Sequence, residues 1–276
     1  MVIMTDTPSL IQTDEDNARD IAVIPAYTVI DDKSYRDLYD INTSELLRKI
    51  KEGAVPKTSQ PSIGEIVDIY ETYDGEILVL PIGDGLSGTY SNMEAAKSIL
   101  ESGDRVHVLD TKTLGGAQNY IVRKALKMRE CGMDICAIKD KLQEYIESSI
   151  SFFIPTDFNF LKRSGRLTPL AAKIGTVMKI VPVMTQTEDK KRICALGIKR
   201  TKNKALMSVV EQLKKNGVDE NYIISVSCDE ISEEVNDVKA LLKENFENTE
   251  VEVFTLVPSL VCHSGPSCIL IQAVKL

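Results

Sequence analysis

Short apolar runs alternate with helix-like segments over the first half of the chain. Apolar runs of strand length lie at 21–25, 76–82 and 105–110. Segments with helical periodicity or caps lie at 43–53, 64–73, 91–102, 114–131 and 134–149. Strands that alternate with helices of this length are typical of βαβ units. The pattern therefore predicts a mainly parallel sheet.

The second half has a different pattern. Two apolar segments within 180–198 are separated by the charged run TEDKK, which predicts a hairpin. Helices are expected at 202–215 and 232–245, and strands near 222–228, 250–256 and 268–274. The hairpin indicates a mixed or antiparallel sheet. We therefore expect two α/β domains, an N-terminal one over 1–152 and a C-terminal one over 153–276.

The composition limits the classes of protein to which the chain can belong. The chain has 276 residues and a formal net charge of −8. No stretch approaches the ~18 apolar residues of a membrane span, and the first residues, MVIMTDTPS, lack the basic region of a signal peptide. We therefore expect a cytoplasmic protein with no stable membrane insertion.

The charge is unevenly distributed along the chain. Residues 160–204 contain 12 Lys/Arg against only Glu188 and Asp189, and such a segment can attract an anionic partner. Aromatic residues make up only 5% and Trp is absent, which argues against nucleic acid because few side chains are available to stack on bases. Cys262, His263 and Cys268 fit no standard zinc spacing, so no metal is expected.

A glycine-rich loop stands between a predicted strand and a predicted helix. Gly83, Gly85 and Gly88 spell G-x-G-x-x-G, a dinucleotide fingerprint, although the acid that ends the next strand, Asp110, lies 27 residues beyond Gly83 instead of about 20. Ser87 also resembles the serine of a nucleophile elbow whose last glycine is missing. Alternatively, free N–H groups at a helix start bind an anion, either carboxylate or phosphate. A plain turn capped by Ser87 is a further interpretation.

Three other stretches carry candidate chemistry. The hydroxyl-rich run Thr58–Ser62 precedes a helix, and Ser62 with Glu65 forms a capping box. His263 lies in a polar segment ahead of Gly-Pro, where we do not expect a helical core residue. Arg166 lies in a predicted loop and is either a surface cation or part of a site.

Taken together, several motifs identify a family. The matching segments are Thr5-Asp6-Thr7, IPAYTVIDDKSYRD (24–37), TSQPS (58–62), GLSGTY (85–90), FLKRSGRL (160–167) and HSGP (263–266). They occur in order over essentially the whole chain, which resembles the DegV family of bacterial fatty-acid-binding proteins.

The resemblance implies two α/β domains with a long-chain fatty acid between them. It implies that the carboxylate is held by the hydroxyls of Thr58 and Ser87, with Ser59, Gly88 and Thr89 beside them. Arg166 and His263 would form the remaining head-group environment. It further implies a lipid-binding carrier without enzymatic activity or cofactor, which in some members presents the fatty acid to a separate kinase for acyl-phosphate formation.

The chain departs from the family pattern before GLSGT, where a serine-rich stretch is usual. Asp84 stands there, and it either places a negative charge near the ligand carboxylate or points to solvent. A glycine is usual at Ser267. Two alternatives from other classes remain: a nucleotide-dependent enzyme that uses Gly83, Gly85 and Gly88, and a serine hydrolase that uses Ser87 with His263.

Overall fold

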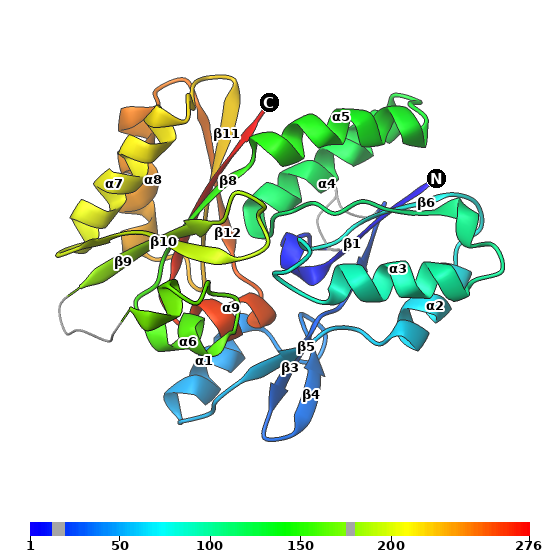
Figure 1. The fold of residues 1–276 in the computed structure, drawn as a ribbon, viewed down its shortest axis with the longest axis horizontal. Coiled ribbons are helices and arrows are strands. Elements are labelled where there is room, and N and C mark those ends of the chain that lie inside the picture. Colours follow the sequence, from blue (N-terminus) through cyan, green and yellow to red (C-terminus); the bar gives the residue numbers. More distant parts are fainter. Residues whose placement is uncertain (13–19, 175–179) are drawn as a thin grey trace.

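A computed structural model describes residues 1–12, 20–174 and 180–276. The described residues form three sheets, surrounded by helices (Figure 1). Short 3-10 helices lie at Thr7–Ser9, Gly103–Arg105 and Ala171–Lys173.

The first sheet is entirely parallel. Its order is β2 (Ile21–Ile24), β1 (Val2–Asp6), β6 (Ile77–Leu80) and β7 (Val106–Val108). Helices α2 (Ile63–Glu71) and α3 (Thr89–Ile99) share a hydrophobic core with these strands. Because β6 is buried along its whole length, its continuous apolar run is that of a central parallel strand. The predicted parallel sheet is confirmed, with β1 as a strand that the sequence pattern did not reveal.

The second sheet is mixed. Its order is β10 (Ile193–Lys199), β9 (Val181–Gln186), β8 (Ile150–Ile154), β13 (Ile269–Lys275), β11 (Tyr222–Cys228) and β12 (Glu250–Thr255). Only β11 and β12 pair in parallel, and β9 and β10 form the predicted hairpin. Helices α7 (Lys202–Lys215) and α8 (Glu233–Asn245) pack on this sheet. The predicted fold class is therefore confirmed.

Helices α4 (Gly115–Glu130) and α5 (Ile135–Ser148) lie between the two large sheets (Figure 1). Ile121 and Val122 of α4 pack against the first sheet, whereas Ala117 and Tyr120 pack against the second. This double burial accounts for the unbroken run of buried residues from Gly115 to Val122. The proposed domain boundary at 152 falls within β8 and stays a prediction.

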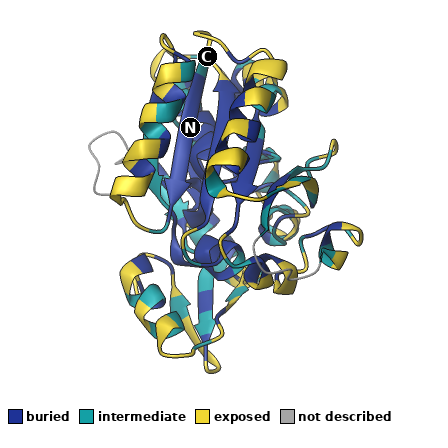
Figure 2. Ribbon diagram, turned by 90° about the vertical axis from the view of Figure 1, so that its left-hand side faces the viewer, coloured by how far each residue is buried: buried dark blue, intermediate teal, exposed yellow. Residues whose placement is uncertain are grey.

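A small antiparallel sheet was not predicted. It has the order β4 (Lys33–Arg36), β3 (Tyr27–Ile30) and β5 (Lys57–Ser59), and it lies with α1 (Thr43–Lys51) at the lower end of the molecule in Figure 1. Its strands are largely exposed or half-buried, in contrast to central strands of the large sheets such as β6 and β11 (Figure 2). Helices α6 (Phe158–Arg163) and α9 (Pro258–Ser264) lie beside it near the centre.

The predicted capping box at the start of α2 is confirmed. Ser62 and Glu65 make the reciprocal bonds of a capping box at the start of α2. The Asp134 carboxylate accepts a hydrogen bond from the Ala137 N–H, 2.9 Å away, and so caps α5. These caps satisfy N–H groups that have no partner within the helix.

Candidate functional site

Six of the seven predicted site residues line one pocket. This head-group pocket has a free volume of about 50 Å³ and brings together the small sheet, the loop after β6, the loop after α6 and helix α9. Its predicted members are Thr58, Ser59, Ser87, Thr89, Arg166 and His263. Contact of these residues with a ligand stays a prediction.

The seventh residue, Gly88, lies next to the pocket as the N-cap of α3. A Cβ atom on Gly88 would lie 2.8 Å from the Gln60 Nε2 atom, so the glycine permits the TSQPS segment to approach the helix start. The Ser87 hydroxyl accepts from the Thr89 N–H at 3.3 Å and lies 2.9 Å from the Thr89 hydroxyl. Ser87 therefore accepts from the first N–H of α3 and lines the head-group pocket at the same time.

Thr58 is placed by β5. It lies opposite Thr28 in the register with β3, and its Oγ1 atom is 2.8 Å from the Nε2 atom of His263. This hydrogen bond joins the small sheet to α9, across 205 positions of the sequence.

His263 is not in a polar turn, so that prediction was wrong. It lies in the last turn of α9, which begins at Pro258 and is followed by its C-cap, Gly265, with φ +76°. Proline suits the first turn of a helix and glycine suits its left-handed end, so the short segment forms a helix in spite of its polar residues. Burial, with a smaller effect from Arg166, lowers the pKa of His263 to about 3. The imidazole is therefore neutral near pH 7.

Arg166 supplies the positive charge of the head-group pocket. Its Nε atom donates to the Leu86 carbonyl oxygen at 3.1 Å, and its Nη1 atom donates to the Ser164 carbonyl oxygen. Burial lowers the pKa of this guanidinium. Within the ranges that the structure describes, no carboxylate pairs with Arg166. A half-buried cation without a counter-ion favours an anionic ligand.

An apolar cavity adjoins the head-group pocket. Its free volume is about 60 Å³. Its apolar lining comes mainly from Ile82, Leu86, Leu114, Phe153, Leu161, Ile193, Leu256, Leu260 and Leu270. Ile82, Leu86, Arg166, Leu260 and His263 line both spaces. The site thus has a polar end and an apolar end in contact.

Two residues of this region were missed by the sequence reasoning. Gln60 lines the head-group pocket and follows Thr58 at the period of two that a strand requires. Asp37 is fully buried and accepts hydrogen bonds from the Ser259 N–H and the Thr28 hydroxyl, both at 2.8 Å. It thereby caps the start of α9, and no local sequence signal links positions so far apart.

The glycine fingerprint is explained by protein packing. A Cβ atom on Gly83 would meet the backbone of Lys112 and Thr113 at 2.8 Å, and one on Gly85 would meet the Lys191 carbonyl oxygen at 2.6 Å. The space beside Gly83 and Gly85 is thus filled by other parts of the chain and not left open for a phosphate group. This weighs against the nucleotide interpretation.

The hydrolase interpretation also lacks support in the geometry. His263 Nε2 bonds to Thr58, whereas Ser87 Oγ contacts Thr89. A serine nucleophile needs a base within hydrogen-bond reach, and an imidazole with a pKa of about 3 is a weak base. Among the described residues, no cluster of His, Cys, Asp and Glu is placed to hold a metal ion. None of the described helices is long and apolar enough to cross a membrane.

Comparison with known proteins gives a match over the whole length. The family model described as "Uncharacterised protein, DegV family" matches residues 1–276. A DegV domain-containing protein of Staphylococcus aureus (strain N315) is 28% identical over 278 residues, which cover 99% of this chain and 98% of the relative.

Solved structures agree with this match. The structure described as fatty acid binding of a DegV family protein from Thermus thermophilus has a TM-score of 0.90 and 26% identity, and covers 100% of this chain and 99% of its own. A fatty acid binding DegV family protein from Streptococcus agalactiae has a TM-score of 0.88 and 26% identity, with coverages of 100% and 98%.

Proposed function

The chain belongs to the DegV family, and on that premise we propose that it binds a long-chain fatty acid. In this proposal the carboxylate occupies the head-group pocket and the tail occupies the apolar cavity. The observation that carries it is the direct junction of these two spaces, which share Arg166, His263 and three apolar residues. The relatives from Thermus thermophilus and Streptococcus agalactiae, which are described as binding fatty acids, support it.

The two ends of a fatty acid contribute differently to binding. Burial of the tail contributes roughly 0.8 kcal/mol per CH₂, so a dozen methylenes supply roughly 10 kcal/mol. The cost of ordering the flexible chain reduces this gain. An unpaired carboxylate is expensive to bury. Hydrogen bonds from Thr58 and Ser87 and the charge of Arg166 would offset that cost.

The first experiment is an organic extraction of the purified protein followed by mass spectrometry. A bound fatty acid supports the proposal. A bound nucleotide would instead support the nucleotide-dependent enzyme, and covalent labelling of Ser87 by a fluorophosphonate would support the hydrolase. The proposal would be refuted if the purified protein carried no fatty acid and took none up from solution.

A double substitution tests the head-group assignment. Thr58→Ala with Ser87→Ala should abolish retention of the lipid while the fold stays intact, because it removes both hydroxyl donors. The matched control is Thr72→Ala with Ser98→Ala, which removes two exposed hydroxyls and should retain the lipid. If the Thr58 and Ser87 variant still carries the same fatty acid, the assignment is wrong.

We further propose that the protein acts as a carrier and not as an enzyme, and that it presents the carboxylate to a separate fatty acid kinase. A pocket of about 250 Å³ reaches Thr58, Arg166 and His263 from the side of Lys57 and Arg163. These cations would attract an acidic partner and its phosphoryl groups. Only part of the basic segment 160–204 would be available to attract a partner, because Lys190 and Lys191 form hydrogen bonds within the protein.

Charge reversal tests the docking of a kinase. Lys162→Glu with Arg163→Glu should slow acyl-phosphate formation without a change in fatty acid affinity. Lys127→Glu with Lys141→Glu, on α4 and α5, is the control for net charge and should have little effect. Kinetics that do not change across a salt series would contradict an electrostatic docking step.

A further inference from the structure

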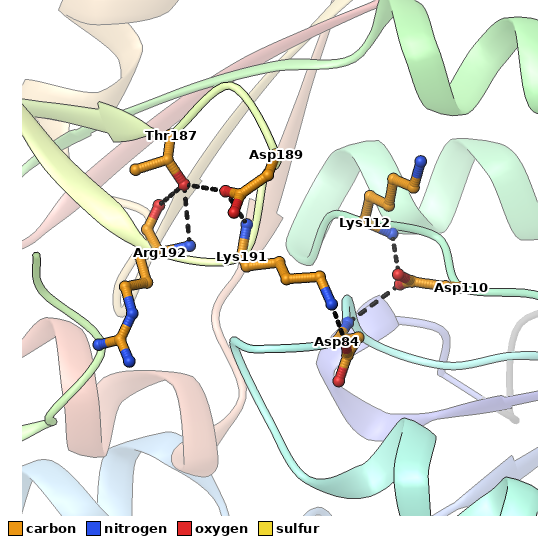
Figure 3. Close-up of polar contacts among 7 residues, drawn as sticks. All are labelled: Asp84, Asp110, Lys112, Thr187, Asp189, Lys191 and Arg192. Carbon is orange, nitrogen blue, oxygen red and sulfur yellow. Dashed lines mark hydrogen bonds and ion pairs between the residues drawn. The ribbon is translucent and has the colours of Figure 1, made fainter.

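The loop that precedes Ser87 contacts a hairpin from the second half of the chain. The Asp84 Oδ2 atom accepts from Lys191 Nζ at 2.6 Å, across 107 positions of the sequence. Figure 3 shows Lys191 extended from the β9–β10 turn toward Asp84. This contact raises the pKa of Lys191. The Asp84 carboxylate thus has a cationic partner in this protein.

The tip of the hairpin is itself held in place. The Asp189 Oδ1 atom accepts from the Thr187 hydroxyl at 2.5 Å and from the Lys191 N–H at 3.1 Å (Figure 3). Lys190 Nζ donates to the Ser149 carbonyl oxygen at 2.8 Å and to its hydroxyl at 2.9 Å, at the C-terminal end of α5. Lys191 therefore projects from a turn that is anchored on both sides.

The loop is bound through three successive residues. The Asp84 N–H donates to Asp110 Oδ1 at 3.0 Å (Figure 3). Gly85, with φ +83°, lies so close to the Lys191 backbone that a Cβ atom has no room. The Leu86 carbonyl oxygen accepts from Arg166. The next residue is Ser87, so these contacts fix the position of the head-group hydroxyl.

We propose that Asp84 and Lys191 are a positioning pair for the ligand site. The inference rests on the proposed fatty acid binding. The pair holds residues 84–86 against the β9–β10 turn, so that Ser87 faces the head-group pocket and Leu86 closes the wall of the apolar cavity. Asp84 acts through Lys191 and not through contact with the ligand.

The proposal makes a prediction opposite in sign to that of simple electrostatics. Asp84→Asn removes a negative charge close to the carboxylate site, and by charge alone it would strengthen binding. If Asp84 positions the loop, the same substitution weakens binding. Lys191→Met also weakens it, because it removes the same contact. Exposed ion pairs change an equilibrium by no more than about five-fold, so we expect a loss of two- to five-fold in each variant.

The experiment measures the affinity of purified, delipidated protein for hexadecanoic acid and for its methyl ester. Mispositioning of Ser87 affects the acid more than the ester, so the ratio of the two affinities should fall in Asp84→Asn and in Lys191→Met. The matched control is Lys202→Met, because Lys202 pairs with Glu234 at the same distance of 2.6 Å on α7 and α8. General destabilisation would lower both affinities and leave their ratio unchanged.

The outcomes separate the two proposals. A reduced ratio in Asp84→Asn and Lys191→Met, an unchanged ratio in Lys202→Met and recovery in Lys191→Arg support the positioning pair. Tighter or unchanged binding of the acid by Asp84→Asn overturns it. If the unmodified protein binds neither ligand, fatty acid binding itself is refuted. If it binds the acid but Asp84→Asn does not weaken that binding, only the positioning pair is refuted.

Discussion

His263 should make the folded protein less stable in acid. Its pKa is about 3 in the folded state because the ring is buried and Arg166 is near. An unfolded chain returns the pKa of His to about 6.5. The unfolded state therefore binds the proton first, so the contribution to stability is complete above about pH 6.5 and is lost as the pH falls toward 3.

The magnitude follows from the size of the shift. A difference of one pKa unit corresponds to about 1.4 kcal/mol, so a shift from 6.5 to about 3 amounts to up to about 5 kcal/mol across the window. Proteins are stable by only about 5–15 kcal/mol, so we expect a detectable effect of this single residue on stability in acid.

The assay is urea unfolding of the wild type and of His263→Gln between about pH 7 and about pH 4. Glutamine does not titrate and keeps polar atoms that can reach Thr58. Two buried carboxyls have the opposite effect, since burial raises the pKa of Asp6 to about 7 and that of Asp37 to about 6. Their contribution is present at low pH and lost as the pH rises through those values. Both proteins share it, so the difference between them isolates His263.

The advantage of the wild type over His263→Gln should shrink steadily as the pH falls below 6.5. His107, the other histidine of the chain, is the control. Burial also lowers its pKa, but Glu76 lies 3.8 Å from its ring and opposes the shift. His107→Gln should therefore have a smaller pH dependence. Parallel profiles for the wild type and His263→Gln would show that His263 is not held neutral by burial.

Two further substitutions test how the site is supported. Asp37→Ala leaves the Ser259 N–H and the Thr28 hydroxyl without an acceptor, so the free energy of unfolding in urea should fall by about 2–5 kcal/mol. Asp37→Asn keeps an acceptor oxygen and should reduce this free energy by less. Equal losses in the two variants would contradict the capping role. Gly85→Ala should lower the free energy of unfolding by about 1–3 kcal/mol more than Gly75→Ala does, measured by thermal or urea unfolding. Both positions have positive φ, but of the two only Gly85 has a neighbouring atom within contact distance of an added Cβ. Similar losses in the two variants would contradict the tight contact at Gly85.

The sequence predicted most of the two large sheets, because strands such as β6 are continuous apolar runs and the helices between the strands have recognisable ends. It did not predict the small sheet, because Lys33–Arg36 is polar and exposed and makes no hydrophobic pattern. It misjudged α9 because the helix is held by tertiary contacts, above all by Asp37 at its start. Local sequence signals do not report such contacts.

The site residues were found as separate motifs, and their assembly in one pocket could not be read from spacing. Thr58 and His263 are 205 positions apart, and Asp84 and Lys191 are 107 positions apart. The sequence allowed two interpretations of Asp84, either a negative charge near the ligand carboxylate or a side chain that faces solvent. Its partner could be identified only once the β9–β10 turn was placed in space.

The arrangement of charges indicates where the affinity of the site arises. With His263 neutral, Arg166 is the only cation among the described residues that line the head-group pocket. One half-buried guanidinium and a few hydroxyls can offset the cost of burying a carboxylate, but they leave little surplus. The tail would then supply most of the affinity. Exchange of the lipid would depend on opening the apolar cavity, whose wall includes Leu86 and Ile193. The loop and hairpin joined by Asp84 and Lys191 carry these two residues, so under this proposal the pair would connect recognition of the head group with retention of the tail.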